Sequence, residues 1–283
     1  MPKTLTQDQV DQFHRDGYLG AVPVLDADEV AYFRGRLEAF ERNHPDDVAK
    51  LKTKSHLLCP WVTEIARHPR LLDVYEDLIG PDILCYSMAW RNKPADSRTI
   101  AGWHQDTLYL PIEPILVIGA LALAECGPDQ GCLQVIPGSH KGEILPHGEA
   151  ADPHSILARG QFIEAEIDTA KAVDLALRPG EIGLFYSGII HGSGPNSSDD
   201  RRLMLLVEMM PTHATSSRRR ESAMLVRGTD TYRHHDADRP AQTEFGPEEQ
   251  AAWLAATESR GRNIFAGSGL PISESYGGER PPR

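Results

Sequence analysis

From residue 83 onward the chain consists of short apolar runs separated by turns rich in glycine and proline, and this texture restricts the fold more than any other feature. Short apolar runs bounded by turn residues are typical of strands. Several of them in succession favour a β-sandwich or a barrel. The predicted strands are residues 83–90, 116–123, 131–136, 175–177, 182–186 and 203–210.

The first 80 residues differ because their apolar residues recur at helical spacing. Thr6 with Gln9 and Asp26 with Glu29 have the spacing of a capping box, which marks the first turn of a helix. We therefore expect helices around the β-rich part. The predicted helices are residues 7–16, 27 to the turn at 43–45, 63–79 and 246–257, and short strands are predicted at 18–24 and 54–58.

Length and composition are those of an ordinary globular protein, with 283 residues of which 40% are hydrophobic and 25% charged. A β-sandwich or barrel surrounded by helices can use this much chain as one domain, and we expect that domain over residues 1–266. Residues 267–283 are rich in Gly, Pro and Ser and predict a loose C-terminal tail unless they fold over something. The long polar segment 142–173 is typical of a lid or a pocket wall.

Charge and cysteine usage exclude several classes of protein. The net charge of −12 argues against nucleic acid as a partner. There is no apolar run long enough for a membrane span and no apolar signal region at the start, so a membrane location is not expected. The four cysteines have no Cys-x-x-Cys spacing, which disfavours a zinc cluster and favours reduced thiols in the cytoplasm. The sequence does not determine the oligomeric state.

The stretch Trp103-His104-Gln105-Asp106 has the clearest chemical meaning. In an extended segment residues i and i+2 point to the same side, so the His104 imidazole and the Asp106 carboxylate should converge. One more imidazole from a distant strand would place two histidines and one carboxylate on one face of a metal ion. That donor set, with open positions opposite, suits non-haem Fe(II) that activates O₂.

Two other His-x-Asp strings have less favourable contexts. The string 44–46 follows a helical pattern, in which residues i and i+2 do not share a face, and the string 234–236 lies in a polar, charged run. Only His104 is followed by predicted strands and by a distant partner, His191. An apolar run enters a glycine-rich turn at His191, so its side chain can reach a pocket.

Arg201 and Arg202 open the apolar run 203–207. An arginine among buried neighbours is costly unless it meets a partner, and a carboxylate matches the guanidinium fork. Strand alternation predicts that one arginine points inward and the other outward, but it does not say which.

An ordered set of motifs resembles the phytanoyl-CoA dioxygenase family of Fe(II)- and 2-oxoglutarate-dependent oxygenases, which also includes ectoine hydroxylase. The resemblance extends from about residue 5 to residue 211 and rests on the order of the motifs, since each is common by itself. The matching pieces are Phe13-His14-Arg15-Asp16-Gly17-Tyr18, Trp103-His104-Gln105-Asp106, Pro137-Gly138-Ser139-His140, Pro179-Gly180-Glu181, and His191-Gly192-Ser193-Gly194-Pro195-Asn196 with Arg202.

The resemblance implies a mainly β fold with flanking helices, a double-stranded β-helix or jelly roll of the cupin-like kind. It also implies Fe(II) and 2-oxoglutarate as cofactor and co-substrate. His104, Asp106 and His191 would be the catalytic iron ligands, while His140 would be a turn residue. The residues implied for the co-substrate are Arg202 on its far carboxylate, Ser193 as a hydroxyl donor to it, and Lys54, which matches an upstream lysine.

The activity implied is hydroxylation of a small-molecule substrate with consumption of O₂ and release of succinate and CO₂. The carboxylate at Asp106 favours hydroxylation over halogenation, since similar halogenases leave that position empty; desaturation and ring closure remain open. The family's substrates include amino-acid derivatives and secondary metabolites, and the sequence does not choose among them. The candidate pocket residues are Trp90, Asn92, Thr107 and Tyr109.

Two other classes of function remain open from the sequence. One is a cupin-like metal enzyme that does not use 2-oxoglutarate, which would need no carboxylate-binding arginine. The other is a catalytically silent binding protein on the same scaffold, which would not retain Fe(II).

Overall fold

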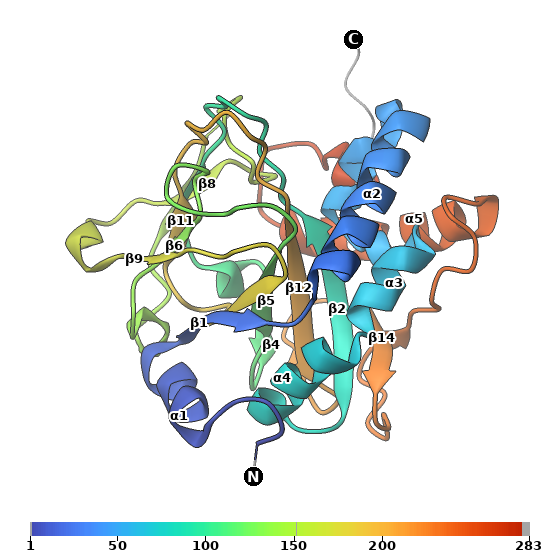
Figure 1. Ribbon diagram of the computed structural model, residues 1–283, viewed down its shortest axis with the longest axis horizontal. Coiled ribbons are helices and arrows are strands. Elements are labelled where there is room, and N and C mark those ends of the chain that lie inside the picture. The colour runs from blue at the N-terminus through green and yellow to red at the C-terminus, as the bar shows by residue number, and fades with distance from the viewer. Residues whose placement is uncertain (1, 151, 279–283) are drawn as a thin grey trace.

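The computed structural model describes residues 2–150 and 152–278 and shows two facing β-sheets of a jelly roll with helices packed on the larger sheet (Figure 1). This confirms the fold class expected from the sequence. The larger sheet has the order β1-β10-β5-β12-β2-β14-β15, and the smaller has the order β3-β11-β6-β9. The strands of the larger sheet are β1 (Tyr18–Pro23), β10 (Glu181–Tyr186), β5 (Val117–Ala122), β12 (Met204–Pro211), β2 (Ile83–Trp90), β14 (Ser222–Arg227) and β15 (Asp236–Ala237).

The smaller sheet carries the residues of interest and is made of short strands. They are β3 (Ala101–His104), β11 (His191–Ser193), β6 (Leu133–Val135) and β9 (Val173–Leu175). Two further strand pairs extend the edges: β4 (Ile112–Glu113) with β13 (Thr215–Ser216), and β7 (His147–Glu149) with β8 (Gln161–Ile163).

The described chain has five α-helices, which share a core with the larger sheet: α1 (Gln7–Asp16), α2 (Ala27–Asn43), α3 (Pro60–Ala66), α4 (Pro69–Ile79) and α5 (Pro247–Ile264). Both predicted capping boxes are present, with the Thr6 hydroxyl and the Asp26 carboxylate accepting hydrogen bonds from the backbone N–H groups of Gln9 and Glu29. Helix α1 ends at Gly17, whose φ of 81° is a left-handed conformation that glycine adopts without strain. Helices α3 and α4 both pack against β2.

Strand β12 shows how the two cores are separated. Leu205, Val207 and Met209 belong to the core between the larger sheet and the helices. Met204 and Met210 belong to the core between the two sheets. Since successive side chains of a strand point to opposite faces, the even-numbered residues of β12 face the smaller sheet.

Two predictions about local structure were wrong, and a third placed the end of a helix too early. Residues 63–79 form two helices, because Pro69 lacks a backbone N–H and starts α4 instead of continuing α3. Residues 54–58 form a short 3-10 helix (Ser55–Leu57), not a strand. The helix predicted at 246–257 extends to Ile264 because apolar and polar residues on one of its faces find buried partners.

The C-terminal segment is more ordered than a loose tail. A 3-10 turn (Glu274–Tyr276) packs against α5, and the Tyr276 ring contacts Phe265 edge to face at 5.8 Å between centroids. Residues 279–283 lie outside the described residues, so the prediction of a tail is not tested for them.

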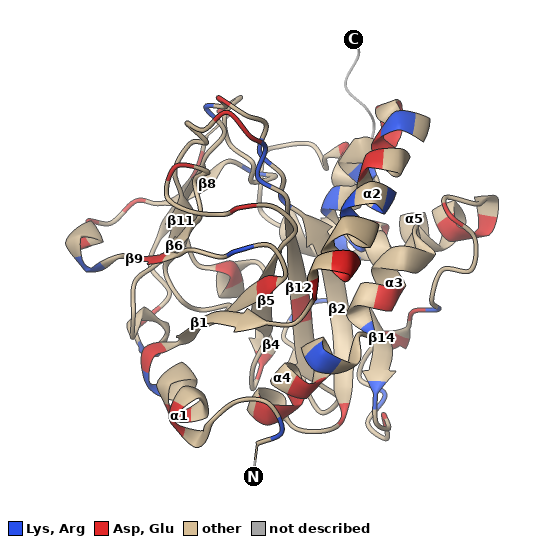
Figure 2. Ribbon diagram, in the orientation of Figure 1, with Lys and Arg blue, Asp and Glu red and all other residues tan. Residues whose placement is uncertain are grey.

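Charged residues of both signs lie mainly on the helices and loops, while the central strands of the larger sheet carry few (Figure 2). No helix in the described part of the chain is both long and apolar enough to span a bilayer. All four cysteines are buried and free.

Candidate metal centre

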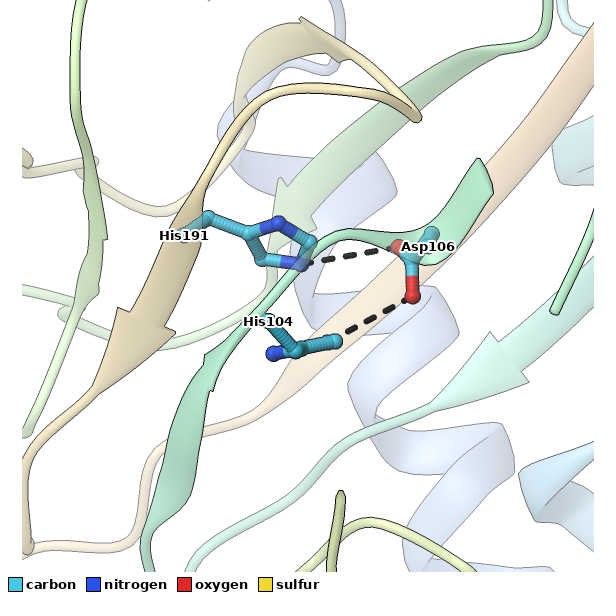
Figure 3. A group of neighbouring side chains, drawn as sticks. All are labelled: His104, Asp106 and His191. Carbon is cyan, nitrogen blue, oxygen red and sulfur yellow. Dashed lines mark ion pairs between the residues drawn. The ribbon is translucent and has the colours of Figure 1, made fainter. Parts of the chain in front are cut away.

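His104, Asp106 and His191 converge where β3 and β11 lie side by side (Figure 3). The antiparallel pairing of β11 with β3 puts His191 directly opposite His104. Gln105 is extended, with φ −126° and ψ 120°, so the Asp106 side chain returns to the same side as His104, as strand alternation predicts. The Nε2 atoms of His104 and His191 lie 3.4 and 3.5 Å from the two carboxylate oxygens of Asp106.

Backbone carbonyls orient both imidazoles. Nδ1 of His104 lies 2.7 Å from the Gly102 carbonyl, and Nδ1 of His191 lies 3.0 Å from the Ile189 carbonyl. A carbonyl can only accept, so Nδ1 of each ring carries a proton and Nε2, which faces Asp106, is the nitrogen available to a metal. Hydrogen bonds of this kind commonly fix the tautomer and ring orientation of metal-binding histidines.

Electrostatics agree with a ligand role. Burial lowers the pKa of His191 to about 4, and the neighbouring His104 imidazole adds to the effect, so His191 is neutral near pH 7. Burial would raise the pKa of Asp106, but His191 and His104 outweigh it and hold the pKa at about 2. The neutral imidazole of His191 and the ionised carboxylate of Asp106 are the protonation states that metal binding requires of these two groups.

Gln105, between the two candidate ligands, points the other way. Its side-chain amide donates to the Gly188 carbonyl at 2.9 Å and accepts from the backbone N–H of Leu145 at 2.9 Å. These bonds hold the loop before β11 and the segment after η4 (Ser139–Lys141) against β3. His140 in that 3-10 turn stacks on Tyr186 at 4.9 Å, so its ring is used in packing.

Arg202 is the inward arginine of the pair. Its side chain is 1% exposed and lines the same cavity as His104, Asp106 and His191. Its guanidinium donates to the carbonyls of Gly131 and Arg91, and its Nε has no hydrogen-bond partner among the described residues. A buried cation that meets only carbonyl dipoles is left with an uncompensated charge.

Arg201 points outward and lies apart from the cavity. Its guanidinium forms two hydrogen bonds with the Glu41 carboxylate, at 2.9 and 2.7 Å. Both residues line a separate, larger hollow that contains none of the candidate metal ligands. The structure therefore shows what strand alternation could not: Arg202 points inward and Arg201 points outward.

Lys93 is a second buried cation beside Arg202 that sequence reasoning missed; it lines the separate hollow, not the cavity, and reaches the cavity only through the hydroxyl of Ser193. Lys93 and Arg202 form an antiparallel bridge, which places their side chains on the same side. Lys93 Nζ donates to Ser193 Oγ at 2.8 Å and to the Gly194 carbonyl. Burial, and then repulsion from Arg202, lower the pKa of Lys93 to about 7. Ser193 itself lines the cavity.

Lys54 does not have the place expected of it. It is wholly buried, and its Nζ donates to the Asp238 carboxylate at 2.7 Å and to the Ser222 carbonyl at 2.8 Å. It is not among the described residues that line the cavity. Asp238 already neutralises the charge of Lys54, so Lys54 does not require the carboxylate of a co-substrate.

The cavity extends well beyond the three candidate ligands. Of the candidate pocket residues, Tyr109 lines it, whereas Trp90 and Asn92 line the separate hollow and Thr107 bonds to Ser187. The long segment 142–173 supplies part of the wall, as predicted. The lining residues that the sequence did not single out are Arg91, Ala101, Leu110, Leu133, Ile156, Leu157, Ala158, Gln161, Met204, Leu206, Glu208, Arg260, Ile264 and Tyr276.

The chain belongs to the phytanoyl-CoA dioxygenase family, since the model of that family matches residues 13–204. It is 28% identical over 151 residues to a probable phytanoyl-CoA dioxygenase of Caenorhabditis elegans, covering 50% of this chain and 48% of the relative. It is 30% identical over 139 residues to the peroxisomal phytanoyl-CoA dioxygenase of Homo sapiens, covering 47% and 41%. The chain thus spans about half the length of these curated relatives.

A solved structure is similar over nearly its whole length. It is described as a non-heme monooxygenase, ThoJ in the apo form, and is 28% identical, with a TM-score of 0.81. The alignment covers 91% of this chain and 97% of that one. The likeness therefore extends beyond the family match, which ends at residue 204, into the C-terminal part of the chain.

Proposed function

We propose that this protein is an Fe(II)- and 2-oxoglutarate-dependent oxygenase that hydroxylates a small-molecule substrate, with release of succinate and CO₂. The observation that carries the proposal is the combination of two donor sets in one cavity. His104, Asp106 and His191 offer two imidazoles and a carboxylate, while Arg202 offers a buried guanidinium with no carboxylate partner among the described residues.

The residues present fit both groups. Three ligands on one side leave positions open for other molecules, the arrangement that suits non-haem Fe(II). At the Arg202 end two buried cations, Arg202 and Lys93, lie beside the Ser193 hydroxyl with no ion pair of their own in the described chain. A carboxylate placed there would meet the Arg202 guanidinium and the Ser193 hydroxyl, with the Lys93 charge behind that hydroxyl, and a dicarboxylic keto acid could reach from them to the metal.

Each residue then has a distinct task. His104, Asp106 and His191 hold the metal, and the Gly102 and Ile189 carbonyls keep the two imidazoles in the ligating tautomer. Arg202 and Ser193 bind and orient the far carboxylate of the co-substrate, with Lys93 polarising the Ser193 hydroxyl. The apolar wall excludes water from the reacting centre. Ferrous iron with 2-oxoglutarate supplies the oxidative decarboxylation that activates O₂ for insertion into the substrate.

Support for this function also comes from the relatives, which are dioxygenases by name, and from the similar non-heme monooxygenase. The four free, buried cysteines are consistent with a reducing compartment, and we propose the cytoplasm. Hydroxylation is the proposed outcome because Asp106 occupies the carboxylate position.

The test is the consumption of 2-oxoglutarate by the purified protein with Fe(II) in air. We expect succinate to form slowly without added substrate, and succinate formation should require Fe(II), O₂ and 2-oxoglutarate together. Retention of Fe(II) without any binding of 2-oxoglutarate would favour the cupin-like metal enzyme instead. Failure to retain Fe(II) would favour the silent binding protein.

A further inference from the structure

Strand β12 and the residues just before it present one side to the cavity along its length. Arg202, Met204, Leu206 and Glu208 are alternate residues, and all four line the cavity. Six residues of extended chain span roughly 20 Å. Arg202 therefore marks the end proposed for the co-substrate, and Glu208 marks the opposite end, which is left for the primary substrate.

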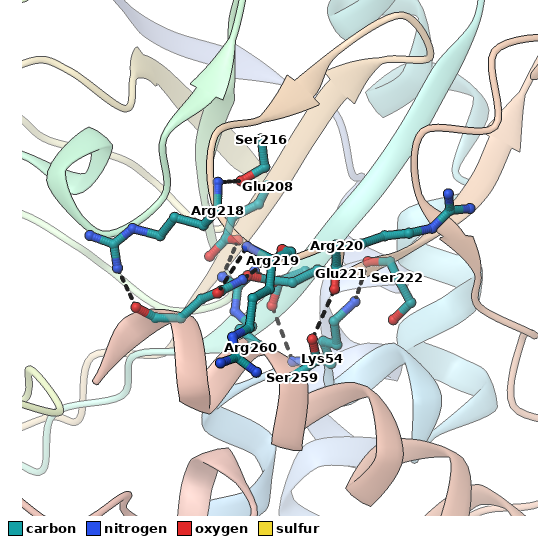
Figure 4. A network of polar contacts seen from close by, with 12 residues as sticks. Lys54, Glu208, Ser216, Arg218, Arg219, Arg220, Glu221, Ser222, Ser259 and Arg260 are labelled. Atoms are coloured by element: carbon teal, nitrogen blue, oxygen red, sulfur yellow. Dashed lines mark hydrogen bonds and ion pairs between the residues drawn. The ribbon is translucent and has the colours of Figure 1, made fainter. Parts of the chain in front are cut away.

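Glu208 is held by an arginine from the C-terminal helix. Arg260 of α5 donates from Nη2 to Glu208 Oε2 at 2.6 Å, and both side chains are almost fully buried (Figure 4). A second carboxylate, Glu221, lies 3.6 Å from Nη1 of the same guanidinium. Asn263 donates to the other oxygen of Glu221 at 2.7 Å. Two buried carboxylates thus share one cation.

The charges at this end do not balance. In the described chain, Arg260 is the one cationic side chain that forms an ion pair with Glu208 or Glu221. The adjacent buried pair of Lys54 and Asp238, visible in part in Figure 4, neutralises itself at 2.7 Å and adds no positive charge. The buried group therefore contains two cationic and three carboxylate side chains. With all five groups ionised, this buried group would carry one negative charge in excess, which a cation bound beside Glu208 would offset.

The carboxylate, rather than the guanidinium, is the group within reach of a ligand. Arg260 also lines the cavity, but its Nη1 and Nε are buried without a hydrogen-bond partner among the described residues, its Nη2 is bonded to Glu208, and the guanidinium lies over the Tyr86 ring at 4.6 Å. Glu208 uses one oxygen for Arg260 and has no other hydrogen bond among the described residues. Tyr109 and Tyr276 add aromatic surface to the cavity wall. A carboxylate in a cavity that is also lined by aromatic rings has the chemistry that recognises organic ammonium groups.

We propose that Glu208 is a specificity-determining residue that binds a positively charged group, a protonated amine or a guanidinium, on the primary substrate. This inference rests on the proposed function, because it uses the position of the metal and co-substrate to assign the remaining part of the cavity. Arg260 acts as a positioning residue, since it holds the Glu208 carboxylate at the wall. The C-terminal segment matters for the same reason, because it brings Arg260 and Tyr276 to the cavity.

The test compares three probes of equal length on protein loaded with Fe(II) and 2-oxoglutarate under argon. Hexylamine, hexanol and hexanoate differ in charge at one end, and their binding is measured by equilibrium dialysis and by the change in the iron-to-keto-acid charge-transfer band. We expect hexylamine to bind at least tenfold more tightly than either other probe. Equal binding of the three, tighter binding of hexanoate, or binding of none would overturn the inference.

Two variants test whether the Glu208 carboxylate itself causes the preference for hexylamine. Glu208→Gln should remove the preference, bringing hexylamine within about threefold of hexanol, whereas Glu258→Gln should retain it because Glu258 is an exposed residue of α5 paired with Arg262. A preference that persists in Glu208→Gln would also overturn the assignment. If Glu208→Gln does not fold, the probe comparison on the unaltered protein still decides. Absence of the charge-transfer band before any probe is added would refute the proposed function, whereas a normal band without cation preference refutes this inference alone.

Discussion

Replacing Arg202 by alanine tests the co-substrate site most sharply. The Arg202 side chain is 1% exposed, so water cannot replace its charge when the guanidinium is removed. Loss of one partner of a buried charge pair costs about 2–5 kcal/mol. Lys93 remains beside the Ser193 hydroxyl and offsets part of the loss. We therefore expect about 2–3 kcal/mol, or roughly a 30- to 150-fold rise in the Kd for 2-oxoglutarate.

The assay is anaerobic titration of the Fe(II)-loaded protein with 2-oxoglutarate, followed by the charge-transfer band. Fe(II) binding should be retained, since the candidate ligands come from other segments. Arg201→Ala is the matched control: its partner Glu41 lies outside the cavity, the pair is partly exposed, and its loss should cost at most about 1 kcal/mol of stability. An unchanged Kd in Arg202→Ala, or a large change in Arg201→Ala, would refute the reasoning.

Three further substitutions have defined outcomes. The Lys93 pKa of about 7 means that its protonated fraction falls as pH rises from 6 to 8, so 2-oxoglutarate should bind more weakly at the higher pH. Lys93→Met should weaken binding about tenfold at pH 6 and flatten that pH dependence, as measured by calorimetry; an unchanged slope would contradict the role of Lys93. His104→Ala should abolish Fe(II)-dependent succinate formation, and undiminished succinate would reject His104 as a ligand. Gly131 has a φ of 62°, its Cβ would meet the Gly194 carbonyl, and its own carbonyl holds Arg202. Gly131→Ala should therefore lower the free energy of unfolding by about 1–3 kcal/mol and also raise the Kd for 2-oxoglutarate, whereas denaturant curves that match the parent protein would show that the strain is absent.

The sequence predicted the fold correctly where residues close together in the chain determine the local structure. The capping residues Thr6 and Asp26 and the turns between apolar runs act within a few residues, and the helices and strands next to them were predicted correctly. The apolar periodicity continues across the break before Pro69 and therefore predicts one helix. The missing backbone N–H of Pro69 ends that helix all the same and starts a new one.

The site was predictable only in part, for a related reason. The spacing of His104 and Asp106 determines that they share a side, and the structure brings His191 opposite them through strand pairing. Alternation predicts that Arg201 and Arg202 point to opposite sides, but it does not say which of them points inward. That depends on which face of the strand lies against the smaller sheet. The choice between Lys54 and Lys93 depends on a bridge between residues far apart in the chain, and no local pattern reports it.

The central claim is that two imidazoles and one aspartate bind a single ferrous ion beside a bound keto acid. Anaerobic titration with Fe(II) in the presence of 2-oxoglutarate tests it directly. We predict a visible charge-transfer band that saturates at one iron per chain and disappears in His191→Ala. Iron binding without that band, or a band of full intensity in His191→Ala, would contradict the claim.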